Sequence, residues 1–387
     1  MKEQLMGWRR ANGKIGIRNH VLVIPASVCA TVCAQRIAAS TEGVVFLDNQ
    51  HGCCQIGLDF TLTERTLIGF GIHPNVSSVL IVGLGCEGIS TQHIAAEMEK
   101  SGKPVRFLII QEEGGTLKTQ EKGIAIVREF AQRAASEPQE PFSVDEIILG
   151  LECGSSDTTS GLCANPALGV ASDALIGAGG TALLSETTEL IGAEHILAKR
   201  ATSPQTAQKL LDIVAQCEAK SMTMGVDLRG SQPTPGNIAG GITTIEEKSL
   251  GCIHKAGSAP VSGVLEYAEL INGSGLFVMD TPGQDVESIT GMVAGGVQVM
   301  VFTTGRGTPV GCPIIPVIKV TGNPNTAVSM KDHIDVNAGL VMTGEANIQQ
   351  MGARIFNEIL DVCAGKQTCA EMLGHHEFGI YKVMSSF

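Results

Sequence analysis

Short, unbroken apolar runs alternate with amphipathic segments in the first half of the chain. The runs expected to form strands are HVLVIPAS (20–27), GVVFLD (43–48), VSSVLIVGLG (76–85) and PVRFLIIQ (104–111). Between them, CATVCAQRIAAS and STQHIAAEMEKSG repeat apolar residues at helical spacing. Apolar strands that alternate with helices predict βαβ units around a parallel sheet covered on both faces.

A polar stretch with two prolines, residues 135–145, separates this pattern from a second alternation. That alternation runs through EIILGLECG, a helical stretch near NPALGVASDALIGAGG, TALLSE, GLFVMD, VQVMVFTTG and PIIPVIKVTGN. We therefore expect an α/β fold with two doubly wound, mostly parallel-sheet domains and a helical C-terminal part. The predicted domains are residues 1–138, which are Rossmann-like, and residues 139–387, which carry catalysis.

Three segments fall outside the strand pattern. Residues 203–224 predict a helix that is polar on one side, and residues 331–373 predict mostly helix. Residues 229–251 form a long glycine- and proline-rich loop that leads into a capped helix. Loops of this length inside compact domains usually serve a function.

Composition and charge narrow the class of protein. The chain has 387 residues, of which 43% are hydrophobic and 17% charged, and its 47 glycines suit many tight turns between strands and helices. A net charge of −12 without a dense Lys/Arg cluster argues against a nucleic-acid partner. No apolar run approaches the roughly 20 residues that span a membrane, and the N-terminus lacks an export signal. We expect a cytoplasmic protein whose 12 cysteines are free thiols or metal ligands.

Polar side chains follow five of the expected strands, where a doubly wound sheet places its ligands. They are His51 with Cys53 and Cys54, Cys86 with Glu87, Glu152 with Cys153 and Asp157, Asp280, and Arg306 with Cys312. A lone thiol behind a strand is usually a small buried hydrophobe. Four of these cysteines lie beside glycine in turns, however, and thiolates from several turns could bind iron or another transition metal. Both interpretations stay open, because no CxxC pair is present.

The stretch ECGSSDTTSGLCANPALG (152–169) is rich in hydroxyl and amide groups behind a strand and before a helix. Ser156 and Asn165 could bind a carboxylate or polyol there, whereas an ordinary capping loop would use Asp157 or Ser160 to cap the helix. Arg306, between glycines, could bind a substrate carboxylate or be a surface arginine in a turn. Glu186 follows the strand TALLSE. Neither GxGxxG after the first strand nor GxxxxGK[ST] occurs, so nucleotide binding is not supported.

Taken together, the long motifs resemble the altronate/galactarate dehydratase family. They are GWRRANGKIGIRNHVLVIPAS, HGCCQIG, VLIVGLGCEG, LECGSSDTTSGLCANPALG, SETTELIGAEH, GNIAGGITTIEEKSLG, MDTPGQDVESITGMVAGGVQVMVFTTGRGTPVGCP and HIDVNAG, and they extend from about residue 7 to residue 378. The resemblance implies a lyase that removes water from sugar acids to give 2-keto-3-deoxy acids. In the sulfolactate sulfo-lyase branch, the large subunit helps to release sulfite and pyruvate.

The resemblance also implies cofactors and partners. Single-chain members carry a small SAF-type domain before the GWRR segment, so we expect this chain to be a large subunit with a separate small SAF-domain subunit, assembled as a homo-oligomer of large subunits. The expected cofactor is a divalent metal or iron centre, Fe²⁺ first, with Mn²⁺ or an iron–sulfur cluster as alternatives. No membrane partner is expected.

Motifs from both branches are present. GSQPTPGNIAGGITTIEEK, HIDVNAG and LGHHEF are similar to the sulfo-lyase large chain, whereas the cysteines of HGCC, GLGCEG and GCP, with MDTPGQD, follow the altronate pattern. We expect an altronate-type dehydratase, with sulfolactate sulfo-lyase as the alternative. A non-catalytic subunit that binds a sugar acid is the alternative of another class.

Removal of a proton next to a carboxylate requires a base, an acid for the leaving hydroxyl, and positive charge to stabilise the enediolate. The residues expected to meet these needs are His51, Glu152 and Asp157 in catalysis; Arg306, Ser156, Asn165 and Glu186 in substrate binding; and Cys53, Cys86, Cys153 and Cys312 as metal ligands.

Overall fold

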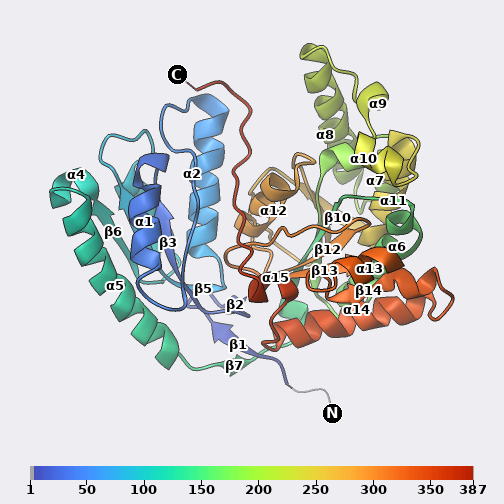
Figure 1. Cartoon of the computed structure of the whole chain (residues 1–387). Coiled ribbons are helices and arrows are strands. Elements are labelled where there is room, and N and C mark those ends of the chain that lie inside the picture. Colours follow the sequence, from blue (N-terminus) through green and yellow to red (C-terminus); the bar gives the residue numbers. More distant parts are fainter. Residues whose placement is uncertain (1–3, 387) are drawn as a thin grey trace.

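A computed structural model describes residues 4–386, and its first part is a parallel sheet with the order β4-β3-β5-β6 (Figure 1). Helices α1 and α5 pack together on one face, and α2 and α3 pack together on the other. The strands are β3 (His20–Pro25), β4 (Val44–Phe46), β5 (Val76–Gly83) and β6 (Val105–Ile109); the helices are α1 (Thr31–Ala38), α2 (Gly57–Ile72), α3 (Thr91–Glu99), α4 (Ile110–Glu113) and α5 (Thr116–Ser136). All eight residues of β5 are buried, as its apolar run predicts.

The second part is a seven-stranded sheet, parallel throughout, with the order β10-β11-β9-β8-β12-β13-β14. Its strands are β8 (Ile148–Gly154), β9 (Thr181–Leu184), β10 (Val261–Leu265), β11 (Gly275–Met279), β12 (Val299–Thr304), β13 (Val317–Thr321) and β14 (Val336–Asn337). Helices α6 (Asn165–Gly177) and α14 (Ile348–Cys363) pack together on one face, while α12 (Asp285–Ala294) lies on the other face against β8. The expected α/β class with doubly wound, mostly parallel sheets is confirmed.

Helix α12 also packs against α2, so one apolar core extends from the first sheet to the second. The predicted domain boundary at 138/139 falls between the end of α5 and β8. A small antiparallel sheet, which the sequence did not predict, crosses this region. It joins β1 (Met6–Arg9) to β2 (Ile15–Gly16) and to β7 (Glu140–Pro141), which lies inside the expected linker.

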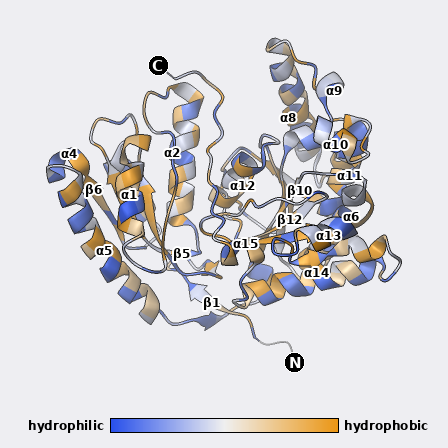
Figure 2. Cartoon of the chain, in the orientation of Figure 1, coloured by the Kyte–Doolittle hydropathy of each residue, from blue (hydrophilic) through white to orange (hydrophobic). Residues whose placement is uncertain are grey.

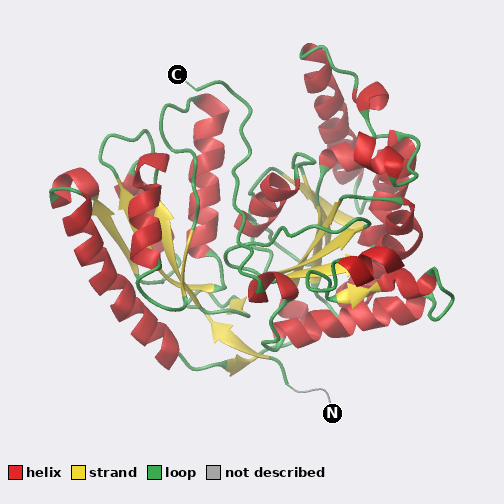
Figure 3. Cartoon of the chain, in the orientation of Figure 1, coloured by secondary structure: helices red, strands yellow, loops and turns green. Residues whose placement is uncertain are grey.

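Residues 204–253 form the helical arm at the upper right of Figures 1 and 3. The expected helix is α8 (Pro204–Thr223), and the expected loop contains α9 (Leu228–Ser231), α10 (Pro235–Ala239) and the start of α11 (Ile245–Ile253). Thr244 caps α11 by accepting a hydrogen bond from the Glu247 N–H. A further short helix, α7 (Glu194–Ala198), packs against α8.

The C-terminal part is less helical than predicted. Helix α14 is present, but it begins only at Ile348, because Asn347 caps its N-terminus. The preceding residues 331–347 consist mainly of turns with the short strand β14. After α13 (Pro324–Ser329), α14 and α15 (Cys369–Met372), an extended tail returns along α2 of the first domain. Asp59 of α2 accepts hydrogen bonds from the N–H groups of Val383 and Met384, at 2.7 and 3.0 Å.

Figure 2 shows hydrophobic residues concentrated in the strands and alternating with hydrophilic ones along α5 and α14. This is the pattern of helices that cover a sheet with one face only. Among the helices within residues 4–386, none combines the length and the apolar character needed to cross a bilayer.

Candidate functional site

One cavity of about 430 Å³ lies at the carboxyl edge of the seven-stranded sheet. Strands β9 and β12 flank β8 on opposite sides, so the chain leaves β8 at a switch point where such sheets bind ligands. The lining residues come from the strand ends and from the helical arm: Cys153, Gly154, Ser155, Ser156, Glu186, Glu189, Thr234, Gly236, Asn237, Lys248, Gly283, Asp285, Arg306 and Gly307.

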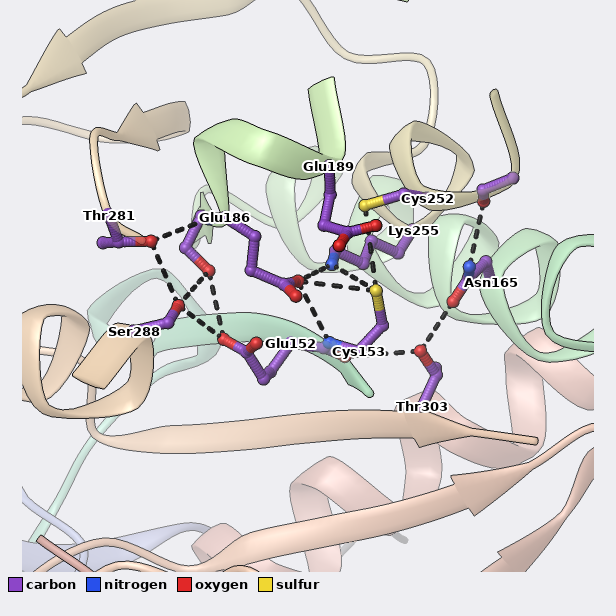
Figure 4. A network of polar contacts seen from close by, with 12 residues as sticks. Glu152, Cys153, Asn165, Glu186, Glu189, Cys252, Lys255, Thr281, Ser288 and Thr303 are labelled. Carbon is purple, nitrogen blue, oxygen red and sulfur yellow. Dashed lines mark hydrogen bonds and ion pairs between the residues drawn. The ribbon is translucent and has the colours of Figure 1, made fainter. Parts of the chain in front are cut away.

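Glu152, near the end of β8, is fully buried and does not line this cavity. Figure 4 shows it within the network of polar contacts beside the cavity residues Cys153 and Glu186. Glu152 Oε2 accepts hydrogen bonds from the hydroxyls of Ser288 and Ser185, at 2.8 and 3.1 Å. Its Oε1 has no hydrogen-bond partner among the described residues. Burial, and next the carboxylate of Glu186, raise the pKa of Glu152 well above its usual value. The side chain is therefore oriented by two hydroxyls but lacks a cation of its own.

Glu186 follows β9 and pairs with Lys255, and both side chains are excluded from solvent. The Lys255 ammonium also lies 3.0 Å from the Cys153 sulfur. Burial alone would lower the pKa of Lys255, but Cys153, Cys252 and Glu186 together raise it well above the usual value. The Glu186 backbone is left-handed (φ 65°, ψ 69°), a conformation uncommon for a non-glycine residue and enriched at functional sites.

A second pair lies closer to the cavity. Lys248 Nζ is 2.7 Å from Glu189 Oε1, and Glu189 Oε2 is buried without a hydrogen-bond partner in the described part of the chain. Burial raises the pKa of Glu189, and Lys248 opposes the shift. Burial lowers the pKa of Lys248, but the carboxylate of Glu189 raises it. The net effect is a pKa above the usual value for lysine. This pair can exchange a proton with a molecule in the cavity.

Two buried thiols lie beside Glu186, and of these only Cys153 lines the cavity. The Cys153 and Cys252 sulfurs are 3.8 Å apart, and the Cys153 thiol and N–H both donate to Glu186 Oε2, at 3.4 and 3.2 Å. The hydrogen bond with Cys252 and then burial raise the pKa of Cys153 well above its usual value. Cys153 is therefore a neutral hydrogen-bond donor here rather than a thiolate nucleophile.

Asp285, the first residue of α12, projects over Gly154. A Cβ atom at position 154 would lie 2.6 Å from Asp285 Oδ2, so the absence of a side chain there makes room for the carboxylate. Burial, followed by the charges of Glu186 and Glu189, raises the pKa of Asp285 to about 7.

Arg306 is the exposed cation at the cavity wall, just after β12. The backbone N–H of Arg306 donates a hydrogen bond to the Ser155 carbonyl at 3.1 Å. The guanidinium lies close to Gly236, where an added Cβ would be 3.2 Å from it. The roof of the cavity is held by Asn237, whose side chain donates to the Ser156 carbonyl at 3.0 Å. Of the predicted substrate-binding residues, Arg306, Ser156 and Glu186 thus lie together at this cavity.

Asp157 and Asn165 lie behind the cavity wall and border a neighbouring pocket. Asp157 Oδ1 accepts from the Thr159 hydroxyl and the Ser160 N–H, at 2.6 and 3.1 Å, and its Oδ2 accepts from Asn323 at 2.9 Å. Asn165 Oδ1 accepts from the Thr303 hydroxyl at 2.6 Å. These contacts are those of the capping loop that the sequence left open as an alternative.

His51, Cys53 and Cys86 lie in the first domain, on loops that follow β4 and β5. A Cβ at Gly88 would lie 3.9 Å from the Gly52 carbonyl, which places the two loops side by side. Burial lowers the pKa of His51, and a hydrogen bond with the Ile380 backbone opposes the shift. None of these three predicted residues lines the cavity described above.

Cys312 is buried in another environment, beside a separate cavity of about 530 Å³ that His20 and Phe46 also line. Burial raises the pKa of Cys312 to about 12. The four cysteines predicted as metal ligands therefore occupy different surroundings: Cys53 and Cys86 on the first-domain loops, Cys153 at the cavity floor, and Cys312 at this other cavity.

Two groups of three side chains within residues 4–386 place their ligand atoms within 4.8 Å of one another. One is Cys153, Glu186 and Cys252, and the other is Glu152, Glu186 and Asp285. The two groups share Glu186, which lines the cavity, and their donor atoms fit a metal ion. Cys53, Cys86 and Cys312 belong to neither group.

Lys248, Cys252 and Lys255 were missed by the sequence reasoning. They are spaced i, i+4 and i+7 through α11 and the turn that follows, and this spacing places them on one face of a helix. The sequence signal that could have revealed them is the occurrence of two lysines and a cysteine on the helix face that otherwise carries buried residues. Asp285 was missed as well, although it lies within the quoted MDTPGQD motif.

Comparison with known proteins places this site within a family. Residues 144–386 match the family model described as D-galactarate/Altronate dehydratase, C-terminal. Residues 7–135 match the model described as D-galactarate dehydratase/Altronate hydrolase, second domain. The chain belongs to the D-galactarate/altronate dehydratase family. The resemblance that the motifs predicted is confirmed. Every residue that lines the cavity lies within residues 144–386, which match the C-terminal family model.

Family members with high similarity fall in both branches. The (2R)-sulfolactate sulfo-lyase subunit beta of Chromohalobacter salexigens is 39% identical over 98% of each chain. The altronate dehydratases of Escherichia coli and Bacillus subtilis are 36% and 34% identical over 97% of this chain and 77% of their own length. These relatives are all named as dehydratases or lyases. The protein is an enzyme of the lyase class, which decides against the non-catalytic alternative.

Proposed function

We propose that the protein dehydrates a sugar acid of the altronate type to a 2-keto-3-deoxy acid. The observation that carries the proposal is that Arg306 lines the same cavity as the Glu189–Lys248 pair. Arg306 supplies a planar guanidinium that can bind the substrate carboxylate through two hydrogen bonds. Glu189 and Lys248 supply a carboxylate and an ammonium that can move a proton within the bound acid.

The reaction breaks two bonds of the substrate. Glu189, which lines the cavity, takes the proton from C2, the electron pair forms a C2–C3 double bond, and the C3–O bond breaks. The proton passes through Lys248, 2.7 Å from Glu189, to the leaving hydroxyl, which departs as water. The resulting enol tautomerises to the 2-keto-3-deoxy acid, so no net proton or electron is needed. The roof residues Thr234 and Asn237 would limit the access of water.

A divalent cation at the floor of the cavity would stabilise the negative charge of the enediolate as a Lewis acid. The metal-ligand groups that share Glu186 support its presence there. The roles predicted for His51, Glu152 and Asp157 in catalysis, and for the thiols as metal ligands, stay predictions. On geometry we assign proton transfer to Glu189 and Lys248, because both line the cavity and those three residues do not.

Sulfolactate is the second candidate substrate. The relative named as a sulfo-lyase subunit matches this chain at nearly equal length, 98% of each. That relative's name also supports an assembly with a second type of subunit, which we propose here to be the small SAF-domain subunit. Sulfolactate carries the same 2-hydroxy carboxylate for Arg306 and Glu189, with sulfite as the leaving group in place of hydroxide.

A substrate panel tests the proposal. The protein is purified without oxygen, with and without the small subunit, and offered aldonates, aldarates and sulfolactate while keto-acid and sulfite release are measured. Keto-acid release from an aldonate without sulfite supports the dehydratase, whereas sulfite release from sulfolactate would replace it. Glu189→Gln should reduce kcat by at least a hundredfold. Glu266→Gln, at a surface carboxylate that is 61% exposed, is the matched control and should not.

A further inference from the structure

Glu186 has a strained backbone in the turn that follows β9. Its φ and ψ of 65° and 69° are left-handed, a region in which the Cβ of an L-residue crowds the following carbonyl. Such a residue keeps this conformation only where the surrounding structure fixes it. Because Glu186 lines the cavity, the contacts that fix its backbone also decide where its carboxylate lies.

The contacts that fix this turn come from Thr281, just beyond the end of β11. Strands β9 and β11 are parallel neighbours that pair as far as Leu184 and Val278, so the residues that follow them lie side by side. The backbone N–H of Glu186 donates to the Thr281 hydroxyl at 2.7 Å. The backbone N–H of Thr187 donates to the Thr281 carbonyl at 3.0 Å. One residue therefore binds two consecutive N–H groups of the turn.

Asp280 strengthens the same attachment. The sequence singled out this residue at a strand end, but it does not line the cavity. Instead, Asp280 Oδ1 accepts a hydrogen bond from the Thr187 hydroxyl. Residues 280–281 thus form a clamp on residues 186–187, in which side chains and backbone both take part.

The Thr281 hydroxyl also donates a hydrogen bond of its own. It donates to Ser288 Oγ at 3.1 Å, and the Ser288 hydroxyl donates to Glu152 Oε2 at 2.8 Å (Figure 4). Thr281 is 3% exposed, so water has little access to replace these bonds. A hydroxyl can accept one hydrogen bond and donate another, which a methyl group cannot. Serine should therefore serve at position 281, whereas valine, which has nearly the shape of threonine, should not.

We propose that Thr281 is a positioning residue that holds the Glu186 carboxylate in the cavity. Thr281 does not line the cavity, so it acts through the backbone of Glu186. Without the hydroxyl, the Glu186 N–H is left buried without an acceptor, and the turn loses a contact that opposes its strain. A change in φ would redirect the Cα–Cβ bond and move the carboxylate away from Lys255 and Cys153. The effect on turnover rests on the proposed function, but the effect on the turn does not.

The first test needs no substrate. Hydrogen–deuterium exchange of the full chain is followed by mass spectrometry in the peptide that contains residues 186 and 187. We expect exchange there to be roughly tenfold faster or more in Thr281→Val, and close to wild type in Thr281→Ser. Thr66→Val is the matched control, because it removes a buried hydroxyl in α2 that donates to the Leu62 carbonyl at 2.7 Å. Unchanged exchange in Thr281→Val, or equally fast exchange in Thr66→Val, would overturn the clamp.

The second test separates positioning from general stability. With the acid that the wild type accepts, Thr281→Val should lower kcat roughly tenfold or more and change KM less than about threefold, because Arg306 is untouched. Thr281→Ser should restore kcat, and Thr66→Val should keep it. Wild-type kcat in Thr281→Val, despite faster exchange, would refute the positioning role.

Two controls keep these outcomes distinct. Near-ultraviolet circular dichroism establishes that each variant is folded, and the smaller Thr281→Ala takes the place of Thr281→Val if valine disrupts the fold. If the wild type turns over none of the acids while exchange behaves as expected, the proposed function fails and the clamp on Glu186 stands.

Discussion

The Lys255 ammonium donates to the Glu186 carboxylate, and the side chains are 0% and 1% exposed. Removing one member of such a pair leaves the other charge buried without compensation. Lys255→Met should therefore lower the free energy of unfolding by about 3–5 kcal/mol, measured by urea denaturation. The double variant Lys255→Met/Glu186→Gln should recover most of this loss. Equal stability of Lys255→Met and the wild type would contradict the ion pair.

Arg306 should contribute to substrate binding rather than to folding. It is exposed at the cavity wall, and loss of a charge-assisted contact to a carboxylate should raise KM roughly ten- to a hundredfold in Arg306→Ala. Arg306→Lys keeps the charge but not the planar fork, so an intermediate KM is expected. Stability should change by no more than about 0.5 kcal/mol in either variant. Steady-state kinetics decide the matter, and an unchanged KM in Arg306→Ala would exclude the contact.

Gly154 should tolerate no side chain. The Cβ of Gly154→Ala would lie 2.6 Å from Asp285 Oδ2 and 2.8 Å from Phe302 Cζ, so Asp285 must move. We expect a loss of about 1–3 kcal/mol of stability and a marked fall in kcat. Gly177→Ala is the control, because nothing lies within 4 Å of its Cβ position at the end of α6. Normal turnover in Gly154→Ala would show that the Asp285 position is unimportant.

His73 should make the fold sensitive to acid. Its Nδ1 accepts from the Asn75 N–H at 3.1 Å, so the proton is on Nε2, which donates to the Val297 carbonyl of the second domain at 2.8 Å. Burial is the main cause that lowers the pKa of His73 to about 3. The unfolded chain takes up a proton below about pH 6.5, while the folded chain does so only near pH 3, so stability is lost as the pH falls.

Between pH 7 and pH 4.5, the difference between the folded and unfolded pKa of His73 should lower the free energy of unfolding by about 2–3 kcal/mol. His73→Gln keeps a donor for Val297 but cannot titrate, so its unfolding free energy should fall less over the same range. The comparison is made by urea denaturation at each pH, and the difference between the two proteins removes the contribution of other groups. Parallel pH profiles would show that folding does not change the pKa of His73.

Polar residues that follow apolar runs lie together where their strands are neighbours in one sheet. Cys153, Glu186 and Arg306 were singled out because each follows an apolar run, and the order β9-β8-β12 brings them to one cavity. His51 and Cys53 satisfied the same pattern but follow strands of the other sheet. The sequence already placed these strands in separate domains, but hydropathy does not show whether the polar edges of two sheets meet at one cavity.

Side chains that reach the site from helices were harder to predict. Lys255 arrives from the turn after α11, whose position depends on packing against α6 and on the arm before it. Asp157 shows a second difficulty, because a polar residue in a glycine-rich loop can contact a ligand or stabilise the loop itself. Only the positions of Ser160 and Asn323 show that its carboxylate is used within the protein.

The cavity is assembled from two kinds of chain segment. Its floor consists of strand ends and the start of α12, whereas Thr234, Gly236 and Asn237 above it belong to the exposed arm between α8 and α11. Substitutions in the arm can therefore alter the length or the stereochemistry of the acid that fits, while the proton-transfer groups keep their places. Proteins with this fold can therefore differ in the leaving group of the acid that they accept through changes in the arm alone.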